Sequence, residues 1–84
     1  MHKKNAILPS QSRAARAMLG WSRQRLAEVA DVAERTIIDF ERGARRPHRR
    51  TIVDIRRTFE EAGIIFIDEN GNGPGVILMG NPEI

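Results

Sequence analysis

The sequence predicts a mainly α fold, a compact bundle of four to five helices followed by a C-terminal β-hairpin. Eighty-four residues, of which 40% are apolar and 30% charged, suit a single small globular domain. Up to Gly63, apolar residues recur at helical spacing between capping residues and glycines. After Gly63 the pattern changes to two apolar runs around an Asn-Gly pair, which is typical of a hairpin.

The N-terminal two thirds of the chain is expected to be helical. Residues 1–9 are polar and basic and end in a proline, so we expect a flexible arm there. Ser10 then offers an N-cap oxygen to the first helix. The four predicted helices cover approximately residues 11–19, 23–30, 33–42 and 48–62. Together they form one domain over residues 10–63, and the last helix is clearly amphipathic.

Residues 64–84 are expected to form the hairpin and a short tail, with strands over 64–68 and 75–79. These strands contain more large apolar side chains than one face of an isolated hairpin could hide, so some must pack on the helices. We assign the apolar strand residues to a homodimer interface, formed by strand pairing or sheet packing: Ile64, Ile65, Phe66, Ile67, Val76, Ile77 and Leu78. A hairpin folded entirely on its own domain is the alternative.

Charge is distributed unevenly along the chain. The stretch from Lys3 to Arg57 holds all fourteen Lys and Arg residues and six Asp and Glu residues, a net charge of +8. The remainder holds five acids and no Lys or Arg, a net charge of −5. A basic body favours a polyanionic partner.

The composition also excludes several classes of protein. Without cysteine there is no disulfide framework and no thiolate metal site, and a cytoplasmic location is expected. The longest unbroken apolar runs are four residues, too short for a membrane span or a signal peptide. His2 and His48 are the only histidines, and neither belongs to a catalytic or metal-ligating pattern. We therefore expect neither an enzyme nor a cofactor.

The most specific pattern lies in the middle of the chain. Trp21-Ser22-x-x-x-Leu26-Ala27, then Val32, then Ile37-x-x-Phe40-Glu41-x-Gly43, resembles the lambda repressor and Cro (Xre-like) helix-turn-helix family. The resemblance covers about residues 10–62 and implies a lambda-repressor-like bundle that binds operator DNA as a dimer. An α-helix fits the major groove of B-form DNA, so the 33–42 helix is expected to enter it. The expected buried positions are Leu19, Leu26, Ala27, Val32, Ile37, Phe40, Ile52, Ile55 and Phe59.

The resemblance assigns base reading to Glu34, Arg35 and Asp39. Arg35 can bond bidentately to guanine O6 and N7, whereas the two acids can only accept, for example from cytosine N4. The acids could equally orient a neighbouring arginine or lie in solvent. Ile38 is unusual on an exposed face, and either touches a thymine methyl group or packs against the 48–62 helix or a partner.

Phosphate contacts are expected at two places. Ser22 and Arg23 match backbone-contacting positions of the family, at a helix N-terminus that favours anions. Five guanidinium groups within nine residues follow the 33–42 helix, a density that phosphate binding explains better than a solvated loop: Arg42, Arg45, Arg46, Arg49 and Arg50.

Other residues are assigned to structure. By resemblance, Arg16 pairs with Glu41. Arg56 and Arg57 are spaced to pair with Glu60 and Glu61 at i, i+4. Trp21 is expected to be a core wedge, and Asp31 stands where the family often has glycine and a left-handed backbone. Ala33 is a weak N-cap for the 33–42 helix.

These observations predict a sequence-specific, double-stranded-DNA-binding transcriptional regulator, in particular a repressor, that binds an inverted repeat as a homodimer. The alternative is a protein-interaction module, such as an antitoxin-like or antiactivator subunit, that uses the hairpin and for which DNA binding is secondary. RNA binding is a weaker third option, because the sequence shows no exposed aromatic pair for base stacking.

Overall fold

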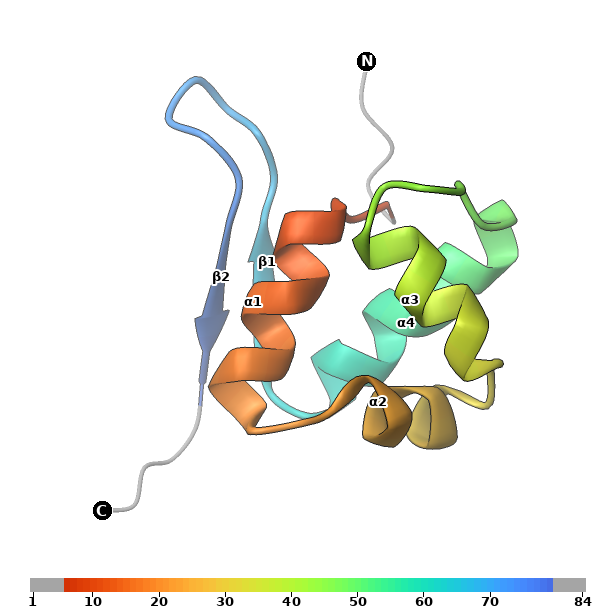
Figure 1. Cartoon of the computed structure of the whole chain (residues 1–84). Helices are drawn as coiled ribbons and strands as arrows, with labels where there is room; N and C mark the ends of the chain where they lie inside the picture. Colours follow the sequence, from red (N-terminus) through yellow and green to blue (C-terminus); the bar gives the residue numbers. More distant parts are fainter. Residues whose placement is uncertain (1–5, 80–84) are drawn as a thin grey trace.

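The computed structural model describes residues 6–79, which form four helices and a two-stranded antiparallel sheet (Figure 1). The elements in chain order are α1 (Pro9–Leu19), α2 (Arg23–Ala30), α3 (Glu34–Glu41), α4 (Arg49–Glu61), β1 (Ile64–Ile67) and β2 (Gly75–Leu78). The mainly α bundle with a C-terminal hairpin is thus confirmed. Each predicted element is present with its ends shifted by one residue or none, except that the first helix starts two residues earlier than predicted.

The segment before α1 differs from the expected flexible arm. Ile7 is 5% exposed and belongs to the hydrophobic core. Leu8 is the N-cap residue of α1 in place of Ser10, and its N–H donates to Gln11 Oε1 at 2.9 Å. Pro9 occupies the first helical position, where its missing N–H costs no hydrogen bond. Burial of one apolar side chain therefore orders residues 6–9, whereas residues 1–5 of the expected arm lie outside the described residues.

The connection between α2 and α3 follows the local signals in the sequence. Ser22 caps α2, because its Oγ accepts a hydrogen bond from the Arg25 N–H at 2.9 Å. Asp31 ends α2 in the left-handed conformation, with φ 61° and ψ 46°, as expected. Val32 N–H then donates to Ala27 O at 3.0 Å, which closes the turn. This short turn fixes the direction in which α3 leaves α2.

The core lies between the four helices and the inner face of the sheet. Seven of the nine expected positions are buried, and Leu19 and Val32 are half-buried at its edge. Trp21 is also half-buried and stacks on Phe59 with ring centroids 6.0 Å apart, which confirms its wedge role. Four further apolar residues are buried that are not among the nine expected positions: Ile7, Ala15, Ile64 and Phe66.

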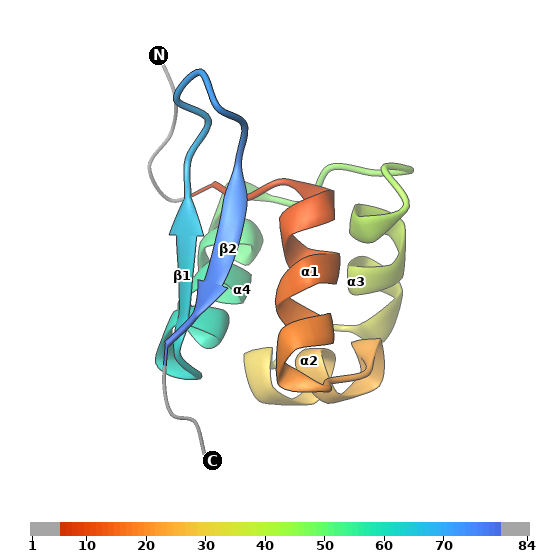
Figure 2. The same cartoon turned by 90° about the vertical axis from the view of Figure 1, so that its left-hand side faces the viewer.

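The hairpin packs against α1 and α4, on the side of α1 away from α3 (Figure 2). Its register pairs Ile64 with Leu78, Ile65 with Ile77 and Phe66 with Val76. Ile64 and Phe66 are 2% and 7% exposed, so they belong to the core of their own chain. Their assignment to a homodimer interface is therefore wrong, because alternate residues of a strand face opposite sides and these two face inward.

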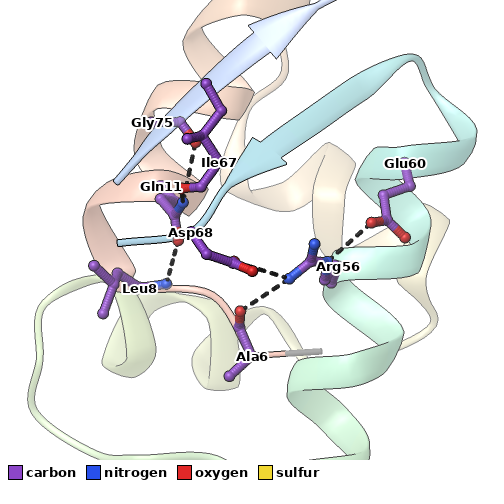
Figure 3. A network of polar contacts seen from close by, with 8 residues as sticks. All are labelled: Ala6, Leu8, Gln11, Arg56, Glu60, Ile67, Asp68 and Gly75. Carbon is purple, nitrogen blue, oxygen red and sulfur yellow. Dashed lines mark hydrogen bonds and ion pairs between the residues drawn. The ribbon is translucent and has the colours of Figure 1, made fainter. Parts of the chain in front are cut away.

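Two polar side chains join the N-terminal segment to the hairpin (Figure 3). Gln11 Nε2 donates to the carbonyl oxygens of Ile67 and Gly75, both at 3.0 Å. Arg56 Nη1 donates to Ala6 O at 3.2 Å and lies 3.7 Å from a carboxylate oxygen of Asp68. Residues 6–8 and the hairpin are thus held in one arrangement.

The surface pairs on α4 match the prediction in one case of two. Arg56 pairs with Glu60, with 2.9 Å between Nε and Oε2. Arg57 does not pair with Glu61 as expected, but reaches back to Asp54, with 2.6 Å between Nη2 and Oδ1. Both i, i+3 and i, i+4 spacings place two side chains on one helix face, so spacing alone could not choose between the two acids.

Candidate nucleic-acid interface

One side of α3 anchors the helix and the other faces solvent. Ile37 and Phe40 are buried in the core, whereas Glu34 and Arg35 are exposed at the N-terminal end of the helix. The Arg35 side chain is 71% exposed. A helix fixed on its inner side with an exposed arginine at its outer end can be presented to a groove of another molecule.

Asp39 is placed to act on Arg35. The carboxylate lies one turn further along α3, with its Oδ1 3.9 Å from Arg35 Nε, and the side chain is 24% exposed. That separation permits electrostatic attraction without a direct hydrogen bond, so Asp39 biases the guanidinium without immobilising it. Ile38 is half-buried, which is the result expected if it packs in part against the body.

The start of α2 offers a second set of donors. Ser22 and Arg23 are both exposed. The Ser22 Oγ accepts from the Arg25 N–H at 2.9 Å, which leaves the hydroxyl hydrogen free to donate outward. Arg23 is the first residue of α2, where the helix carries partial positive charge. The arrangement suits an anion.

The predicted arginine cluster runs from the C-cap of α3 into the first turn of α4, and all five members are exposed: Arg42, Arg45, Arg46, Arg49 and Arg50. The loop between them is fixed to α3, because Asp39 O accepts the N–H groups of Ala44 at 2.9 Å and Arg45 at 3.3 Å. Gly43, with φ 73°, allows the sharp turn that this requires.

Arg49 and Arg50 occupy a position that is electrostatically unfavourable in the free protein. They are the first two residues of α4, whose first turn contains no acid. The N-terminus of a helix carries partial positive charge, so two cations there are repelled by the helix as well as by each other. A bound anion would offset both effects, which favours phosphate binding over a purely solvated role.

Base-reading and phosphate candidates meet at one hollow of about 390 Å³ between α3 and the α3–α4 loop. Arg35, Arg45 and Arg46 line this hollow together with Asp39. Four further lining residues were not assigned to this site from the family pattern: Thr36, Pro47, His48 and Thr51. His48 is the N-cap residue of α4 but makes no side-chain capping bond. The course of the α3–α4 loop brings the lining residues of this loop and of α4 close to Arg35, and no pattern in the sequence indicates that course.

The outer face of the hairpin is apolar. Ile65 and Ile77 form a cross-strand pair, with exposures of 44% and 45%. Leu78 pairs with Ile64 and so points to the opposite face from Ile77, but at the end of β2 it is still 44% exposed, and Met79 after it is 53% exposed. These four side chains, and not the buried Ile64 and Phe66, are available for contact with another molecule.

The described residues contain neither a cluster of metal ligands nor a membrane-spanning helix. Within residues 6–79, no group of three or more His, Cys, Asp or Glu side chains could hold a metal ion. In the same part of the chain no helix has the length and apolar character needed to cross a membrane.

Comparison with known proteins agrees with this geometry. A family model described as "Helix-turn-helix" (HTH_3) matches residues 13–61, which extend from within α1 to the end of α4. A search of curated proteins found no match.

Proposed function

Because the chain belongs to the HTH_3 helix-turn-helix family, of Cro/C1 (Xre-like) type, we propose that it is a sequence-specific transcriptional regulator that represses by occupying an inverted-repeat operator as a homodimer. The helix-turn-helix domain itself implies that the protein binds DNA. The form of the operator, the dimer and the repressor role are the proposal, and the exposed Arg35 beside the arginine-lined hollow is the observation that carries it.

In the proposed complex α3 lies in the major groove, with Arg35 bonded to a guanine. Asp39 orients Arg35 or accepts from a cytosine, and Glu34 is in reach of the same base edges. Ile38 contributes an apolar contact through its exposed part. Each good pairing with a base edge provides about 1–3 kcal/mol of discrimination against the wrong base.

The remaining arginines supply affinity in this proposal. Ser22 and Arg23 hold the phosphates on one side of the groove, and the arginine cluster defined above holds those on the other. Six to ten phosphate contacts would reduce affinity by about 10³–10⁵ between about 50 and 200 mM salt.

The hairpin is the proposed dimer contact, through Ile65, Ile77 and Leu78, together with the half-buried Ile67. Val76 is left out of this contact, because it pairs with Phe66 on the inner face and packs against the core. A two-fold axis there would relate two copies of α3, which would read half-sites whose centres are one helical turn, roughly 34–36 Å, apart. Such a dimer represses transcription where its operator overlaps a promoter.

Selection of binding sites from random duplex DNA tests the proposal. The expected result is an enriched inverted repeat, bound with the steep salt dependence given above. Enrichment of a single half-site would refute the dimer but not DNA recognition. No enrichment, together with a flat response to salt, would refute the regulator and favour the protein-interaction module that uses the hairpin.

A further inference from the structure

A second hollow, of about 490 Å³, lies around the N-terminal segment. Residues 6–9 run between the α3–α4 loop and the loop that follows β1 (Figures 1 and 2). Its apolar lining comes from three elements of the fold: Ile7, Leu8, Phe40 and Ile52. This N-terminal groove shares Arg45 and Arg46 with the hollow beside α3 but includes none of the base-reading candidates.

The N-terminal groove has opposite charges on its two loops. Arg45 and Arg46 come from the α3–α4 loop, and Asp68 and Glu69 come from the loop after β1. Asp68 is 42% exposed and its carboxylate lies 3.7 Å from Arg56, too far for a direct hydrogen bond (Figure 3). One Glu69 oxygen accepts from the Gly71 N–H at 3.3 Å. Both carboxylates therefore keep acceptor sites for another molecule.

DNA binding does not explain this combination. Phosphate would use the two arginines but would be repelled by the two acids, and the apolar lining would contribute nothing to it. A molecule with an anionic end, a cationic end and an apolar middle would use all three features. The volume of the groove falls in the range of about 300–1,000 Å³ that is usual for small-molecule sites.

We propose that the N-terminal groove binds a small zwitterion with an apolar body. Its anionic group bonds to Arg45 and Arg46, its cationic group to Asp68 and Glu69, and its body lies on Ile7, Leu8 and Ile52. A ligand so placed occupies two of the arginines assigned to DNA phosphates. It would therefore weaken DNA binding, and this regulatory part rests on the proposed function, whereas ligand binding itself does not.

The test uses linear amino acids as probes: 6-aminohexanoate, 8-aminooctanoate and 10-aminodecanoate. Octanoate and octylammonium, each with one charge, serve as controls. Binding to the full chain without DNA is measured by calorimetry and by NMR shifts of the lining residues. We expect at least one zwitterion to bind about tenfold or more tightly than either control, since each control lacks one charge-assisted contact. Equal affinity of zwitterions and controls would refute the proposal, as would the absence of binding.

Variants locate the site. The double substitution Asp68→Asn with Glu69→Gln should weaken zwitterion binding about tenfold or more, whereas octanoate binding should not weaken, because the substitutions remove two charges that repel its carboxylate. Glu69→Gln alone, at an exposed position, provides the same test should the double variant fail to fold. Glu61→Gln is the matched control, because Glu61 is an exposed acid outside the groove. Equal effects of Glu61→Gln and Glu69→Gln would refute the assignment.

Two further measurements separate the possible occupants. Deletion of residues 1–5 should leave the zwitterion affinity unchanged. If binding appears only after that deletion, the chain's own N-terminus fills the groove and the proposal is wrong. With DNA present, the best zwitterion should weaken binding to a random-sequence duplex in the parent protein but not in the double variant. A protein that binds the zwitterion but no duplex would refute the proposed function and leave the ligand site intact.

Discussion

Arg16 of α1 and Glu41 of α3 form a bidentate ion pair, with 2.6 Å between Nη2 and Oε1 and 2.9 Å between Nε and Oε2. The Glu41 side chain is 1% exposed, and its Oε2 also accepts from Ser12 Oγ at 2.6 Å. Arg13 donates to the Glu41 backbone oxygen. These bonds fix the C-terminal end of α3 to α1, and thereby the angle at which the exposed end of α3 leaves the body.

Removal of one partner from this pair should be strongly destabilising. Arg16→Ala leaves a buried carboxylate that keeps a hydrogen bond from Ser12 but loses the cation that pairs with it, so we expect the free energy of unfolding to fall by about 3–5 kcal/mol. Denaturant unfolding followed by circular dichroism measures this loss. Arg57→Ala, which breaks the exposed pair with Asp54, should cost about 1 kcal/mol or less. Similar losses for the two variants would show that burial of Glu41 does not govern the effect.

Arg35→Ala should separate recognition from folding. The Arg35 side chain is 71% exposed, and its ion pair with Asp39 is a weak attraction, with 3.9 Å between Nε and Oδ1. The unfolding free energy should therefore change by about 0.5 kcal/mol or less. Affinity for the selected operator should fall by about 1–3 kcal/mol, while affinity for unrelated duplex should fall much less. Arg57→Ala removes the same charge from α4 as a control. A uniform loss on all sequences would assign Arg35 to phosphate instead of base contact.

Arg49→Gln should have opposite effects on stability and on DNA binding. Loss of a cation from the first turn of α4 should stabilise the free protein by about 0.3–1 kcal/mol, because the helix N-terminus is itself positive. The same substitution should weaken binding to every duplex and lower the salt slope by about one. Thermal unfolding and titrations at several salt concentrations measure the two effects. An unchanged salt slope would exclude Arg49 from the phosphate contacts.

Ala33→Ser should stabilise α3. Ala33 is the N-cap residue, with φ −66° and ψ 140°, and supplies no side-chain bond to the first turn. A serine in that backbone conformation can accept from an N–H of α3, and such caps contribute about 1 kcal/mol. Unfolding experiments on the free protein test this. Ala44→Ser in the following loop, at a position that caps no helix, should have no comparable effect.

Local features of the fold followed from the sequence, and non-local ones did not. The Ser22 cap and the left-handed Asp31 depend on residues within one turn, so their residue types were sufficient. Ile7 looked like part of a polar arm because the core that buries it is built from distant helices. The sequence suggests a dimer contact for Phe66 because both faces of its strand are apolar. Only the packing of the hairpin on the helices shows which of the two faces is buried.

The candidate site also has local features that the sequence predicts and non-local features that it does not. The exposure of Arg35 follows from its helical phase relative to Ile37 and Phe40, which the sequence displays directly. The contributions of Thr51 and His48 to the hollow beside α3 depend on the path of the α3–α4 loop. That path is set by backbone hydrogen bonds to Asp39 O, for which side-chain identity gives no signal.

The outer face of the hairpin provides the test of dimerisation. Deletion of the whole hairpin would also remove Ile64 and Phe66 from the core, so substitution is preferable. Ile65→Thr with Ile77→Thr keeps β-branched residues in both strands but removes apolar contact area at the proposed interface. We expect sedimentation at micromolar concentration to show a monomer in place of a dimer, with retained folding and weaker binding to the inverted repeat. Val29→Thr, at an equally exposed position on α2, should leave the dimer intact. A dimer that survives both hairpin substitutions would place the contact elsewhere, and a monomeric parent protein would refute the homodimer.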